Sequence, residues 1–433
     1  MSTPPELSQT NRDSADEQSI VIVGGCGHVG LPLGIALARS GATVTLLDTD
    51  TVRVRSVGAG RMPFLEKGAD DALPKALANG RLAVTSDPEA IGRHAAVIVT
   101  IGTPVDAHLD PTIATFDASM AAVLDEMHDR QLLVLRSTVF PGITDRLARR
   151  AAEIGLSIDV AHCPERIAQG YALEEIGELP QIVGGATPSA AARASRLFGL
   201  LGVRIVVLPA VEAELAKLFS NAYRYLNFAI SNQFYMVAQK FGADFARIHR
   251  AVTTDYPRMA AFARAGFTGG PCLLKDTMQL AGFNHNEFAL GQAAMMVNEG
   301  LPRVLVDGVK AQHPLAHATA AILGMAFKGN SDDRRASLSY KLRKILELEC
   351  RRVLCTDPYI HDPDFVSLDE ALAQADVIFI GACHDQYRHL KIEKPTVDVF
   401  GFLKSSEDHE DPGDGRGGLH RRLPGRRAVG PRP

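Results

Sequence analysis

The chain has 433 residues, of which 46% are hydrophobic and 22% charged, and its formal net charge is −4. This length allows two or three domains with a sizeable core, and the near-neutral charge gives no electrostatic reason to expect nucleic acid as a partner. No run of about 18 apolar residues occurs, so no membrane span is predicted. Residues 1–18 are polar and acidic and do not resemble a signal peptide, so we expect a disordered leader.

The first structured segment is predicted to be a strand, a glycine-rich turn, a helix and a second strand. An apolar strand at 20–23 leads into GGCGHVG, a helix extends through Ala38, and a strand at 44–47 ends at Asp48. Glycines in such a turn let the backbone approach a pyrophosphate at the helix N-terminus. Asp48 lies 18 residues after Gly30, the spacing of a carboxylate on a ribose diol, and favours NAD because it would repel a 2′-phosphate. A glycine-rich turn in an unrelated α/β protein is the alternative.

Two further strands, at 96–101 and 132–135, are predicted to end in polar residues. Ligands of an open parallel sheet collect at the carboxyl ends of its strands. The hydroxyl groups found there are therefore candidates to line a cleft: Thr103, Ser137 and Thr138. Helix capping is the alternative use of such side chains.

Three domains are expected after the leader. The first, at 19–208, contains the strands above and one more apolar strand at 181–183. The second, at 209–302, is helical. The third, at 316–403, alternates strands and a helix but lacks GxGxxG, so no second dinucleotide is expected there. Residues 404–433 are rich in Gly, Pro and Arg and should form a disordered tail.

The helical domain should contain one very long helix. No proline or glycine interrupts residues 211–241, a length that suits a connector between domains or a dimer interface. Lys217 and Asn221 lie at i and i+4 and therefore share one face. A second helix is expected at 287–298. The aromatic and Met residues of both helices are interpreted as packing residues: Phe219, Tyr223, Phe234, Tyr235, Met236, Met295 and Met296.

The six cysteines are spread along the chain without a CxxC pair: Cys26, Cys163, Cys272, Cys350, Cys355 and Cys383. This spacing argues against a disulfide framework and a zinc site, so we expect no metal and a reducing cytoplasm as the location. Most of the six should be buried as small apolar side chains. One of them could be a nucleophile.

The stretch GGPCLLKDTMQL places Cys272 in a loop, with Lys275 and Asp276 close behind it. Attack of a thiolate on an aldehyde gives a thiohemiacetal, which can lose a hydride and become a thioester that water releases as an acid. Lys275 and nearby backbone amides should favour the thiolate, and Asp276 could orient or deprotonate the water. From these residues alone, a structural role for Cys272 remains open.

Taken together, the motifs resemble those of the UDP-glucose/GDP-mannose dehydrogenase family, the four-electron nucleotide-sugar dehydrogenases. The resemblance covers residues 19–402 and is carried by GGCGHVGLPLG, RSTVFPGIT, CPER, EAELAKLFSNAYRY, GFTGGPCLLKD and ILGMAFKGNSDDRRAS. It implies an α/β fold of two Rossmann-like, doubly wound domains joined by a long central helix. It also implies NAD as cofactor, a UDP-sugar as substrate and a homodimer, without nucleic acid or membrane as partners.

The resemblance implies a catalytic role for each matching side chain. Cys272 is similar to the nucleophile that forms the thioester. Lys217 is similar to the cation that stabilises developing oxyanions, with Asn221 beside it. Asp276, with Thr138, is similar to the carboxylate that holds the hydrolytic water.

Glu165, in CPER, is similar to the family glutamate near the sugar carbon that is oxidised. The residues expected to hold the cofactor are Gly25, Gly27, His28, Val29, Gly30, Asp48, Arg53, Thr103, Pro104, Ser137 and Thr138. The residues expected to hold the nucleotide sugar are Glu165, Arg166, Lys217, Asn221, Arg258, Phe267, Gly269, Gly270, Lys328 and Arg335.

Several segments are most similar to the branch of this family that oxidises UDP-N-acetylmannosamine: CPERIAQG, SNQFYMVAQ, TTDYPR and GGPCLLKDTMQL. Gln169 also replaces an acid that the UDP-glucose branch carries, and His28 stands where an aromatic residue is usual. A UDP-N-acetylhexosamine is therefore the expected substrate, with UDP-glucose or another nucleotide sugar as the alternative. A catalytically silent binding protein and a two-electron dehydrogenase of a small hydroxy acid are the other interpretations.

Overall fold

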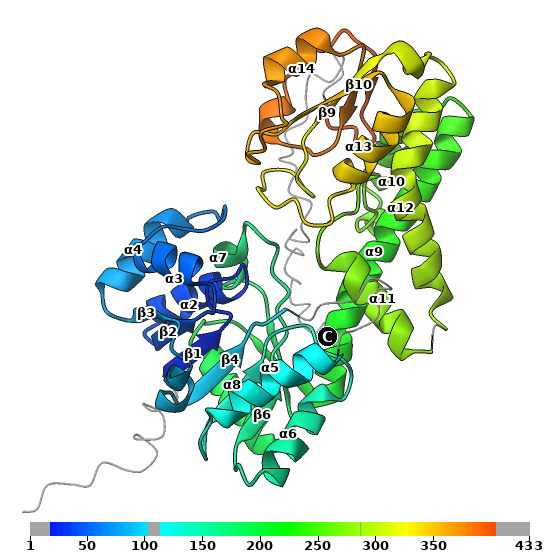
Figure 1. Cartoon of the computed structure of the whole chain (residues 1–433). Coiled ribbons are helices and arrows are strands. Elements are labelled where there is room, and N and C mark those ends of the chain that lie inside the picture. Colours follow the sequence, from blue (N-terminus) through cyan, green and yellow to red (C-terminus); the bar gives the residue numbers. More distant parts are fainter. Residues whose placement is uncertain (1–17, 103–112, 286, 404–433) are drawn as a thin grey trace, which may run out of the picture.

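The computed structural model describes residues 18–102, 113–285 and 287–403. These residues form two lobes, each built around a largely parallel sheet, which long helices connect along one side of the molecule (Figure 1). The predicted α/β fold, with two Rossmann-like domains joined by a long central helix, is confirmed. Thr103 and Pro104, predicted to hold the cofactor, lie outside the described residues.

The N-terminal lobe contains an eight-stranded sheet. Its strands are β1 (Ser19–Val23), β2 (Thr43–Leu47), β3 (Leu82–Thr85), β4 (Ala96–Val99), β5 (Leu132–Leu135), β6 (Asp159–His162), β7 (Gln181–Gly185) and β8 (Ile205–Pro209). Their order is β3-β2-β1-β4-β5-β6-β7-β8, and only β6 and β7 pair antiparallel among the described strands. The carboxyl ends of β1, β4 and β5 therefore meet at one edge, where a ligand can bind.

Helices cover both faces of this sheet, which explains why its central strands are apolar on both sides. The helices are α2 (Gly30–Arg39), α3 (Thr51–Gly58), α4 (Ala69–Ala78), α5 (Ile113–Asp125), α6 (Ile143–Glu153), α7 (Ala172–Glu175) and α8 (Pro188–Gly199). α2 and α8 belong to the core on one face, and α5 and α6 belong to the core on the other.

The sequence analysis does not predict β3, β6 or β8. β3 and β8 form the two edges of the sheet and are partly exposed, so neither shows a fully buried apolar run. β6 begins with Asp159 and ends with His162, which interrupts the apolar pattern. Edge strands and strands with polar ends carry a weaker sequence signal than the buried centre of a sheet.

Four helices form the connection between the lobes: α9 (Ala210–Lys240), α10 (Phe245–Thr253), α11 (Leu273–Phe283) and α12 (Ala289–Lys310). The long helix predicted at 211–241 is confirmed by α9. The helix predicted at 287–298 is too short, because α12 continues through Pro302, where Leu301 and Leu305 bury one face of the helix. α11 is not predicted.

Four of the aromatic and Met residues predicted to be packing residues are not buried within the single chain. Phe219, Tyr223, Phe234 and Met296 are 54%, 61%, 52% and 73% exposed, respectively. Sequence periodicity reports that a face is apolar, and it does not report which surface covers that face.

The C-terminal lobe contains a four-stranded parallel sheet of β9 (Thr319–Leu323), β10 (Arg352–Thr356), β11 (Val377–Ile380) and β12 (Thr396–Val397), in the order β10-β9-β11-β12. Its helices are α13 (Leu338–Glu349) and α14 (Leu368–Gln374). One core joins β9 and α13 to Leu301 and Val306 of α12, so the lobe packs directly on the connecting helices. Within the described ranges, no helix is long and apolar enough to cross a bilayer.

Candidate active site

The turn between β1 and α2 has room only for glycine at two positions. A Cβ atom on Gly25 would lie 2.7 Å from the carbonyl oxygen of Ile22, and one on Gly30 would lie 2.7 Å from that of Gly24. Among the described residues, no side chain caps α2 at Val29. Leu31 already donates its N–H to the Gly27 carbonyl at 3.0 Å, so the N–H of Gly30, at the start of the helix, is the group placed to bind an anion. The turn therefore fits the pyrophosphate of a dinucleotide.

Asp48 lies beside this turn at the end of β2. Its Oδ2 accepts the backbone N–H of Cys26 at 3.0 Å, and its Oδ1 accepts that of Asp50 at 3.0 Å. A carboxylate fixed at this position can bind the hydroxyl groups of a ribose. Asp50 caps α3 by accepting the N–H groups of Val52 and Arg53, and the Arg53 guanidinium lies 3.4 Å from Asp50. This side of the turn therefore fits the adenosine half of NAD.

His28, in the same turn, makes contacts outside it. Its ring packs against Phe64 with centroids 3.9 Å apart and the planes tilted by 37°, and the side-chain amide nitrogen of Gln169 lies 3.2 Å from its Nδ1 and 3.5 Å from its Nε2. Burial, and after it the Arg335 guanidinium, lowers the pKa of His28 to about 4. The ring is therefore a neutral acceptor at pH 7.

Asp276, in the first turn of α11, joins two of the other predicted catalytic residues. Its carboxylate is fully buried. Oδ2 accepts the amide of Asn221 at 2.5 Å and the hydroxyl of Thr138 at 3.5 Å. Lys275 Nζ lies 3.1 Å from the other oxygen, Oδ1. A carboxylate oriented in this way can activate a water molecule.

Cys272 lies in the turn that directly precedes α11, as the prediction of a loop around it requires, and it is the N-cap residue of that helix, which is not predicted. The residue is exposed, yet desolvation of the thiol and the charge of Asp276 raise its pKa, and these effects outweigh the lowering by Lys217 and Lys275. Lys275 therefore favours the thiolate as predicted, but its effect on the pKa of Cys272 is smaller than the opposing effects of desolvation and Asp276. Lys275 forms an ion pair with the buried carboxylate of Asp276, so the negative charge of Asp276 compensates part of the positive charge of Lys275.

Lys217 and Glu165 form an ion pair whose side chains are 8% and 14% exposed, and both charges act on Cys272. Lys217 Nζ lies 3.8 Å from Oε2 of Glu165. The second oxygen of Glu165, Oε1, is buried and has no hydrogen-bond partner among the described residues. Because a buried acceptor without a partner is destabilising, a ligand or a water molecule should satisfy it. Glu165 therefore fits a contact with substrate.

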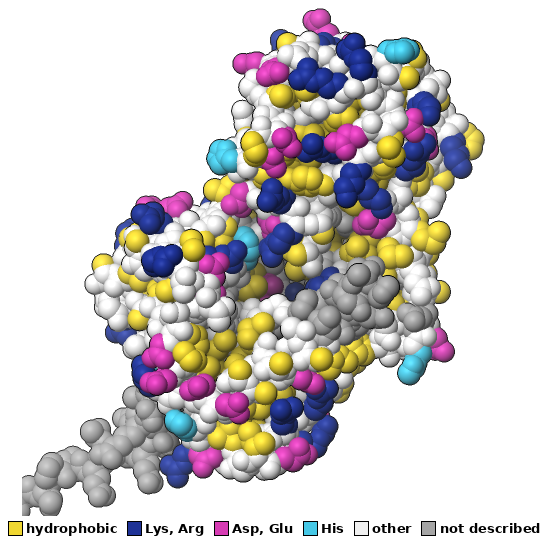
Figure 2. Space-filling view, in the orientation of Figure 1, with side chains coloured by type: hydrophobic (Ala, Val, Ile, Leu, Met, Phe, Trp, Pro, Cys, Tyr) yellow, Lys and Arg dark blue, Asp and Glu magenta, His cyan; other side chains and the backbone are white. Residues whose placement is uncertain are grey.

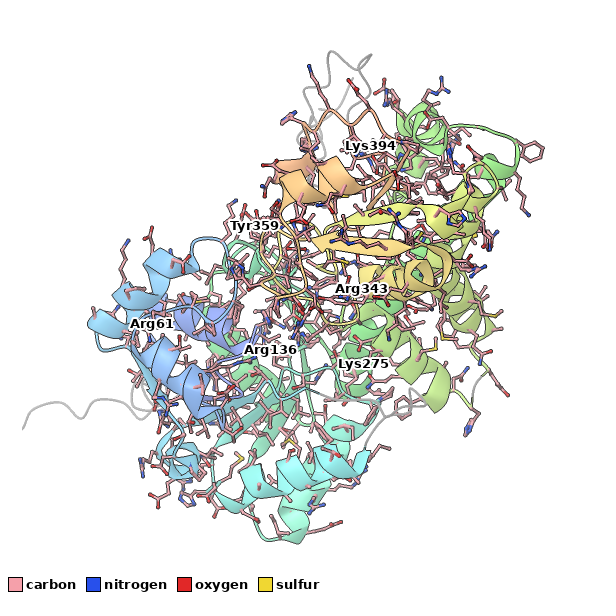
Figure 3. All side chains as sticks on the ribbon, turned by 45° about the horizontal axis from the view of Figure 1, so that its top comes forward. Arg61, Arg136, Lys275, Arg343, Tyr359 and Lys394 are labelled. Carbon is pink, nitrogen blue, oxygen red and sulfur yellow. The ribbon has the colours of Figure 1, made fainter. Side chains whose placement is uncertain are left out.

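Arg136 holds the backbone that leads to Glu165. Its buried guanidinium donates to the side-chain oxygen of Gln181 at 2.8 Å and to the carbonyl of Cys163 at 3.2 Å. The Gln181 amide donates in turn to the carbonyl of Pro164 at 3.2 Å. Figure 3 shows Arg136 near the junction of the two lobes. The sequence analysis assigns it no role, although a cation directly after a buried strand is a signal of a buried polar network.

Glu214 fixes the loop that carries Thr138. Its buried carboxylate accepts the N–H groups of Gly142 and Thr144 at 2.5 and 2.8 Å and the Thr144 hydroxyl at 2.5 Å. Burial raises the pKa of Glu214. Glu214, which belongs to α9, thus caps the N-terminus of α6. The sequence does not reveal this role, because Glu214 and Thr144 are 70 residues apart.

The glycines before Cys272 fit directly onto the C-terminal lobe. Gly270 donates its N–H to the carbonyl of Ala336 at 3.1 Å. A Cβ on Gly269 would lie 2.7 Å from the same oxygen, and one on Gly270 would lie 2.6 Å from the Phe327 ring. Gly270 also has φ +99°, which favours glycine. The cysteine segment and the loop at 325–337 therefore form one packed unit.

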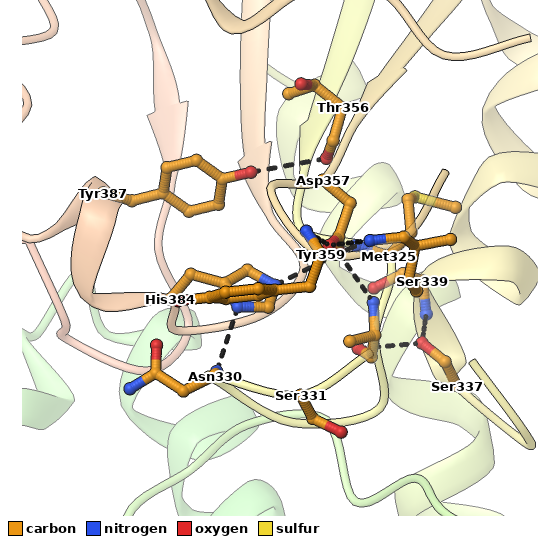
Figure 4. Close-up of polar contacts among 12 residues, drawn as sticks. Met325, Asn330, Ser331, Ser337, Ser339, Thr356, Asp357, Tyr359, His384 and Tyr387 are labelled. Carbon is orange, nitrogen blue, oxygen red and sulfur yellow. Dashed lines mark hydrogen bonds and ion pairs between the residues drawn. The ribbon is translucent and has the colours of Figure 1, made fainter. Parts of the chain in front are cut away.

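Two buried side chains hold the loop at 325–337 in place. Oδ2 of Asp357 accepts the N–H of Met325 at 2.6 Å and lies 3.1 Å from Nε2 of His384 (Figure 4). Nδ1 of His384 accepts the N–H of Asn330 at 3.0 Å, so Nε2 carries the proton that is donated to Asp357. The loop is thereby fixed to the ends of β10 and β11.

The predicted substrate residues Lys328 and Arg335 both lie on this loop. Lys328 donates to the carbonyl of Gln169, and burial lowers its pKa. Arg335 is held by Asp333, with Nη2 2.6 Å from Oδ2, and interacts electrostatically with Cys272. Charged side chains gather in the hollow between the lobes, as Figure 2 shows. The two cations are therefore available to a phosphate group.

Two predicted residues bind backbone carbonyls of their own lobe. Ser137 donates its hydroxyl to Ile101, and Arg166 donates to Pro180. Both side chains therefore fix the ends of strands, and a direct contact with ligand is not required to explain them.

Two further predicted residues make contacts outside the cluster around Cys272. Arg258 is exposed on the 3-10 helix η2 (Pro257–Met259) and donates to the Tyr256 hydroxyl at 2.6 Å. Phe267 packs edge-on against Phe400, with centroids 5.9 Å apart. Within the described ranges, no group of three or more His, Cys, Asp or Glu side chains could hold a metal ion.

Three models of one family match the chain in order. The NAD binding domain of the UDP-glucose/GDP-mannose dehydrogenase family matches residues 18–201, its central domain matches 211–300, and its UDP binding domain matches 321–404. The glycine turn, the cysteine segment and the loop at 325–337 lie in these three parts, respectively.

Similar proteins agree with this match. A UDP-N-acetyl-D-mannosamine dehydrogenase of Pyrococcus horikoshii is 30% identical over 389 residues, covering 86% of this chain and 91% of the relative. An NDP-N-acetyl-D-galactosaminuronic acid dehydrogenase of Ralstonia nicotianae is 28% identical over 401 residues, covering 88% and 94%.

Solved structures of two relatives superpose on most of the chain. That of UDP-D-ManNAc dehydrogenase from Pyrococcus horikoshii gives a TM-score of 0.81 at 29% identity, covering 86% of this chain and 91% of the other. That of a UDP-glucose dehydrogenase from Pyrobaculum islandicum gives a TM-score of 0.81 at 28% identity, covering 89% and 94%. The chain therefore belongs to the UDP-glucose/GDP-mannose dehydrogenase family, the NAD-dependent dehydrogenases of nucleotide sugars.

Proposed function

We propose that the protein oxidises a UDP-N-acetylhexosamine, most specifically UDP-N-acetylmannosamine, at C6 to the uronic acid through a thioester on Cys272. The observation that carries this proposal is the position of Cys272 next to two polar groups. Asp276, held by Asn221, lies on one side, and the Lys217–Glu165 ion pair lies on the other. A nucleophile, a base and a cation are the three groups that oxidation of an alcohol to an acid needs.

In the first oxidation, the C6 alcohol loses a proton and a hydride to become an aldehyde. The unpaired Oε1 of Glu165 is the acceptor for the hydroxyl group, and Lys217 stabilises the negative charge that develops on its oxygen. Bound NAD+ supplies the hydride acceptor for both oxidations. Gly25, Gly30 and Asp48 would hold this cofactor.

In the second oxidation, the sulfur of Cys272 forms a bond to the aldehyde carbon, and the resulting thiohemiacetal loses a hydride to become a thioester. Because the thiol pKa is raised, its proton must leave as the bond forms. Asp276 then takes a proton from water, whose oxygen attacks the thioester and releases the carboxylate and the thiol. Lys217 stabilises the tetrahedral oxyanion. One alcohol and one water thus yield one carboxylate and two NADH.

The uridine diphosphate would bind to the C-terminal lobe. Lys328 and Arg335 offer cations at the cleft, and the loop that carries them packs on Gly269 and Gly270. This packing would place the sugar of a bound nucleotide within reach of Cys272, which follows two residues after Gly270. Arg258 and Phe267 are proposed as further contacts on the strength of the family resemblance alone.

The choice of an N-acetylated sugar is supported by the relatives that act on such sugars and by the CPER segment. The fold alone does not favour it, because a UDP-glucose dehydrogenase superposes equally well. UDP-glucose is therefore the second candidate substrate.

The test measures NADH formed per sugar with UDP-N-acetylmannosamine, UDP-N-acetylglucosamine and UDP-glucose offered separately. Two NADH per UDP-N-acetylmannosamine are expected. Formation of two NADH per sugar with UDP-glucose alone would support the thioester route and would reject UDP-N-acetylmannosamine as the substrate. A Cys272→Ala variant should form no acid, whereas Cys350→Ala, a half-buried thiol of the C-terminal lobe, is the matched control. Acid formation by Cys272→Ala would contradict the role of Cys272 as the nucleophile. If the wild type binds the nucleotide sugar and forms no NADH, the protein is a catalytically silent binding protein.

We propose a homodimer formed through α9. An exposed apolar stripe follows the helix with the spacing of one face: Phe219, Tyr223, Ile230, Phe234 and Val237. A stripe of this length on a monomer would be an unusually large apolar patch, which usually marks a protein interface. A second copy of the same helix is the occupant that matches it along its whole length.

The domain limits 19–208, 209–302 and 316–403 are also proposed. They are supported by the end of β8 at Pro209 and by the start of the second sheet at Thr319. A cytoplasmic location is proposed from the six cysteines, all of which are free thiols.

A further inference from the structure

Gln169 touches both lobes at once. It follows the CPER segment in the N-terminal lobe, where the buried carboxylate of Glu66 accepts the next backbone N–H, that of Gly170, at 3.0 Å. Its side-chain Nε2 lies 3.2 Å from Nδ1 of His28 and 2.9 Å from Oδ2 of Asp333 in the C-terminal lobe. The side chain therefore spans the cleft between the two ligand sites.

The chemistry of a primary amide suits this position. Its nitrogen carries two hydrogens, one for each of the two acceptors. The carboxylate of Asp333 can only accept, so it fixes which end of the amide faces it. The second hydrogen is available to the neutral His28 ring, whose Nδ1 and Nε2 lie 3.2 and 3.5 Å from the amide nitrogen. A glutamate at this position would have no hydrogen to donate and would place a second charge near Asp333.

Asp333, which accepts the amide of Gln169, also accepts hydrogen bonds from Arg335. It accepts Nε of Arg335 at 3.0 Å on both oxygens and Nη2 at 2.6 Å, so the guanidinium is gripped at two points. Asp333 is 7% exposed, whereas more than half of the Arg335 side chain remains exposed and available to a ligand. Gln169 therefore orients the carboxylate that orients Arg335.

A second contact runs in parallel. Phe64, against which His28 packs, is followed by Leu65, whose N–H donates to Oδ2 of Asp332 at 3.1 Å. The glycine turn is thus joined to the loop at 325–337 through two routes, and only Gln169 reaches both His28 and that loop among the described residues.

We propose that Gln169 is a positioning residue that couples the two ligand sites, so that a dinucleotide at the glycine turn and a uridine nucleotide at the loop strengthen each other's binding. The inference rests on the proposed function, which places NAD and the UDP-sugar at these two sites. Either ligand, by ordering its own segment, also orders the segment of the other through the shared amide. Coupling of this kind is reciprocal.

The test measures this coupling directly on the full-length protein. NADH is titrated by its own fluorescence with and without saturating UDP, and UDP is titrated by calorimetry with and without NADH. The chain has no Trp, so its own fluorescence does not overlap strongly with that of NADH. In the wild type, each ligand should tighten the other by about 5-fold or more. In Gln169→Ala, both factors should fall to near one.

Two variants separate positioning from a structural effect. His28→Phe keeps a ring on Phe64 and removes the acceptor of one hydrogen bond, so it should also lower the coupling factor. Gln169→Met keeps the side-chain volume and lacks both donors, and it replaces Gln169→Ala if the latter unfolds. Gln312→Ala, an exposed glutamine after α12, is the matched control and should retain full coupling.

Coupling that persists in Gln169→Met would overturn the inference. A residue with a merely structural role would change the melting temperature, or the affinities for both ligands, but it would leave unchanged the factor by which one ligand tightens the other. A wild-type protein that binds both ligands with a factor of one would also overturn it and leave the proposed function intact. A wild-type protein that binds neither ligand would refute the proposed function together with the inference.

Discussion

Asn221 donates its side-chain amide to Oδ2 of Asp276 at 2.5 Å and so joins the middle of α9 to the first turn of α11. Both residues are buried, and the contact fixes one carboxylate oxygen while Thr138 approaches the same atom at 3.5 Å. The remaining oxygen, Oδ1, lies 3.1 Å from Lys275 Nζ and accepts no hydrogen bond from Asn221 or Thr138, so we assign to it the proton taken from water. Hydrolysis of a thioester on Cys272 would therefore depend on this pair.

We expect Asp276→Asn to trap the thioester. The substitution keeps the shape of the side chain and removes the base, so hydrolysis should slow by at least about 100-fold while formation of the thioester continues. Intact-protein mass spectrometry should then show the sugar nucleotide bound to the enzyme during turnover. The double variant with Cys272→Ala should show no adduct, and an unchanged rate of acid formation in Asp276→Asn would contradict the role of the base.

The rate at which Cys272 is alkylated should increase with pH, and this increase should occur at a higher pH than for an ordinary thiol. An unperturbed thiol has a pKa of about 8.5, and desolvation together with Asp276 raises that of Cys272. The thiol form therefore dominates at pH 7, and alkylation by iodoacetamide should reach its half-maximal rate at a higher pH than for an unperturbed thiol. Lys217→Ala should move the profile to still higher pH, because Lys217 lowers this pKa.

Asp276→Asn should move the same alkylation profile toward lower pH, because it removes a charge that raises the pKa of Cys272. The rate is followed by peptide mass spectrometry at Cys272, with Cys350 of the same samples as the internal control. Profiles that shift in the same direction for the Lys217 and Asp276 variants would show that these charges do not control the thiol.

Glu214→Ala should destabilise the protein by about 2–4 kcal/mol, because it leaves two backbone N–H groups and a hydroxyl without their buried acceptor. Glu214→Gln keeps one acceptor oxygen and should have a smaller effect. Urea unfolding followed by circular dichroism provides the measurement. Glu212→Ala, an exposed residue of the same helix, should stay within about 0.5 kcal/mol of the wild type; equal losses in both variants would contradict the capping role.

The double variant Phe219→Glu/Tyr223→Glu should convert a dimer into a monomer. Two carboxylates on the exposed apolar stripe of α9 would be buried without partners if two copies of the helix packed together. Light scattering at micromolar concentration should give twice the chain mass for the wild type and once the chain mass for the variant. Leu348→Glu, at an 85% exposed position of α13, should remain dimeric. A monomeric wild type would reject the proposed interface.

The parts of the fold that the sequence predicts are those encoded over short distances. The unit from β1 to Asp48 is one example, because the glycines, the apolar strands and the acid each have a local physical reason. α9 is another, since an uninterrupted apolar periodicity defines it. The helix that begins after Cys272 was hidden by the preceding Gly-Gly-Pro, which indicates a loop.

The parts that could not be predicted depend on contacts between distant segments. The charge of Lys275 lowers the pKa of Cys272, as its place in the sequence suggests, but the desolvation of the thiol that outweighs this effect becomes visible only in the fold, as does the ion pair of Lys275 with the buried Asp276. Gln169 and Asp333 are 164 residues apart and belong to different lobes. No local pattern of sequence indicates that they share a hydrogen bond.

The contact of Gly270 with Ala336 has a consequence for the order of events in catalysis. It joins the segment of Cys272, the proposed nucleophile, to the loop that is proposed to hold the nucleotide, while the glycine turn belongs to the other lobe. An enzyme that needs two successive oxidant molecules must release the first before it accepts the second. Under the proposed function, this division would let the spent dinucleotide depart by a movement of the N-terminal lobe alone, while the half-oxidised sugar would stay bound to the other unit throughout the exchange.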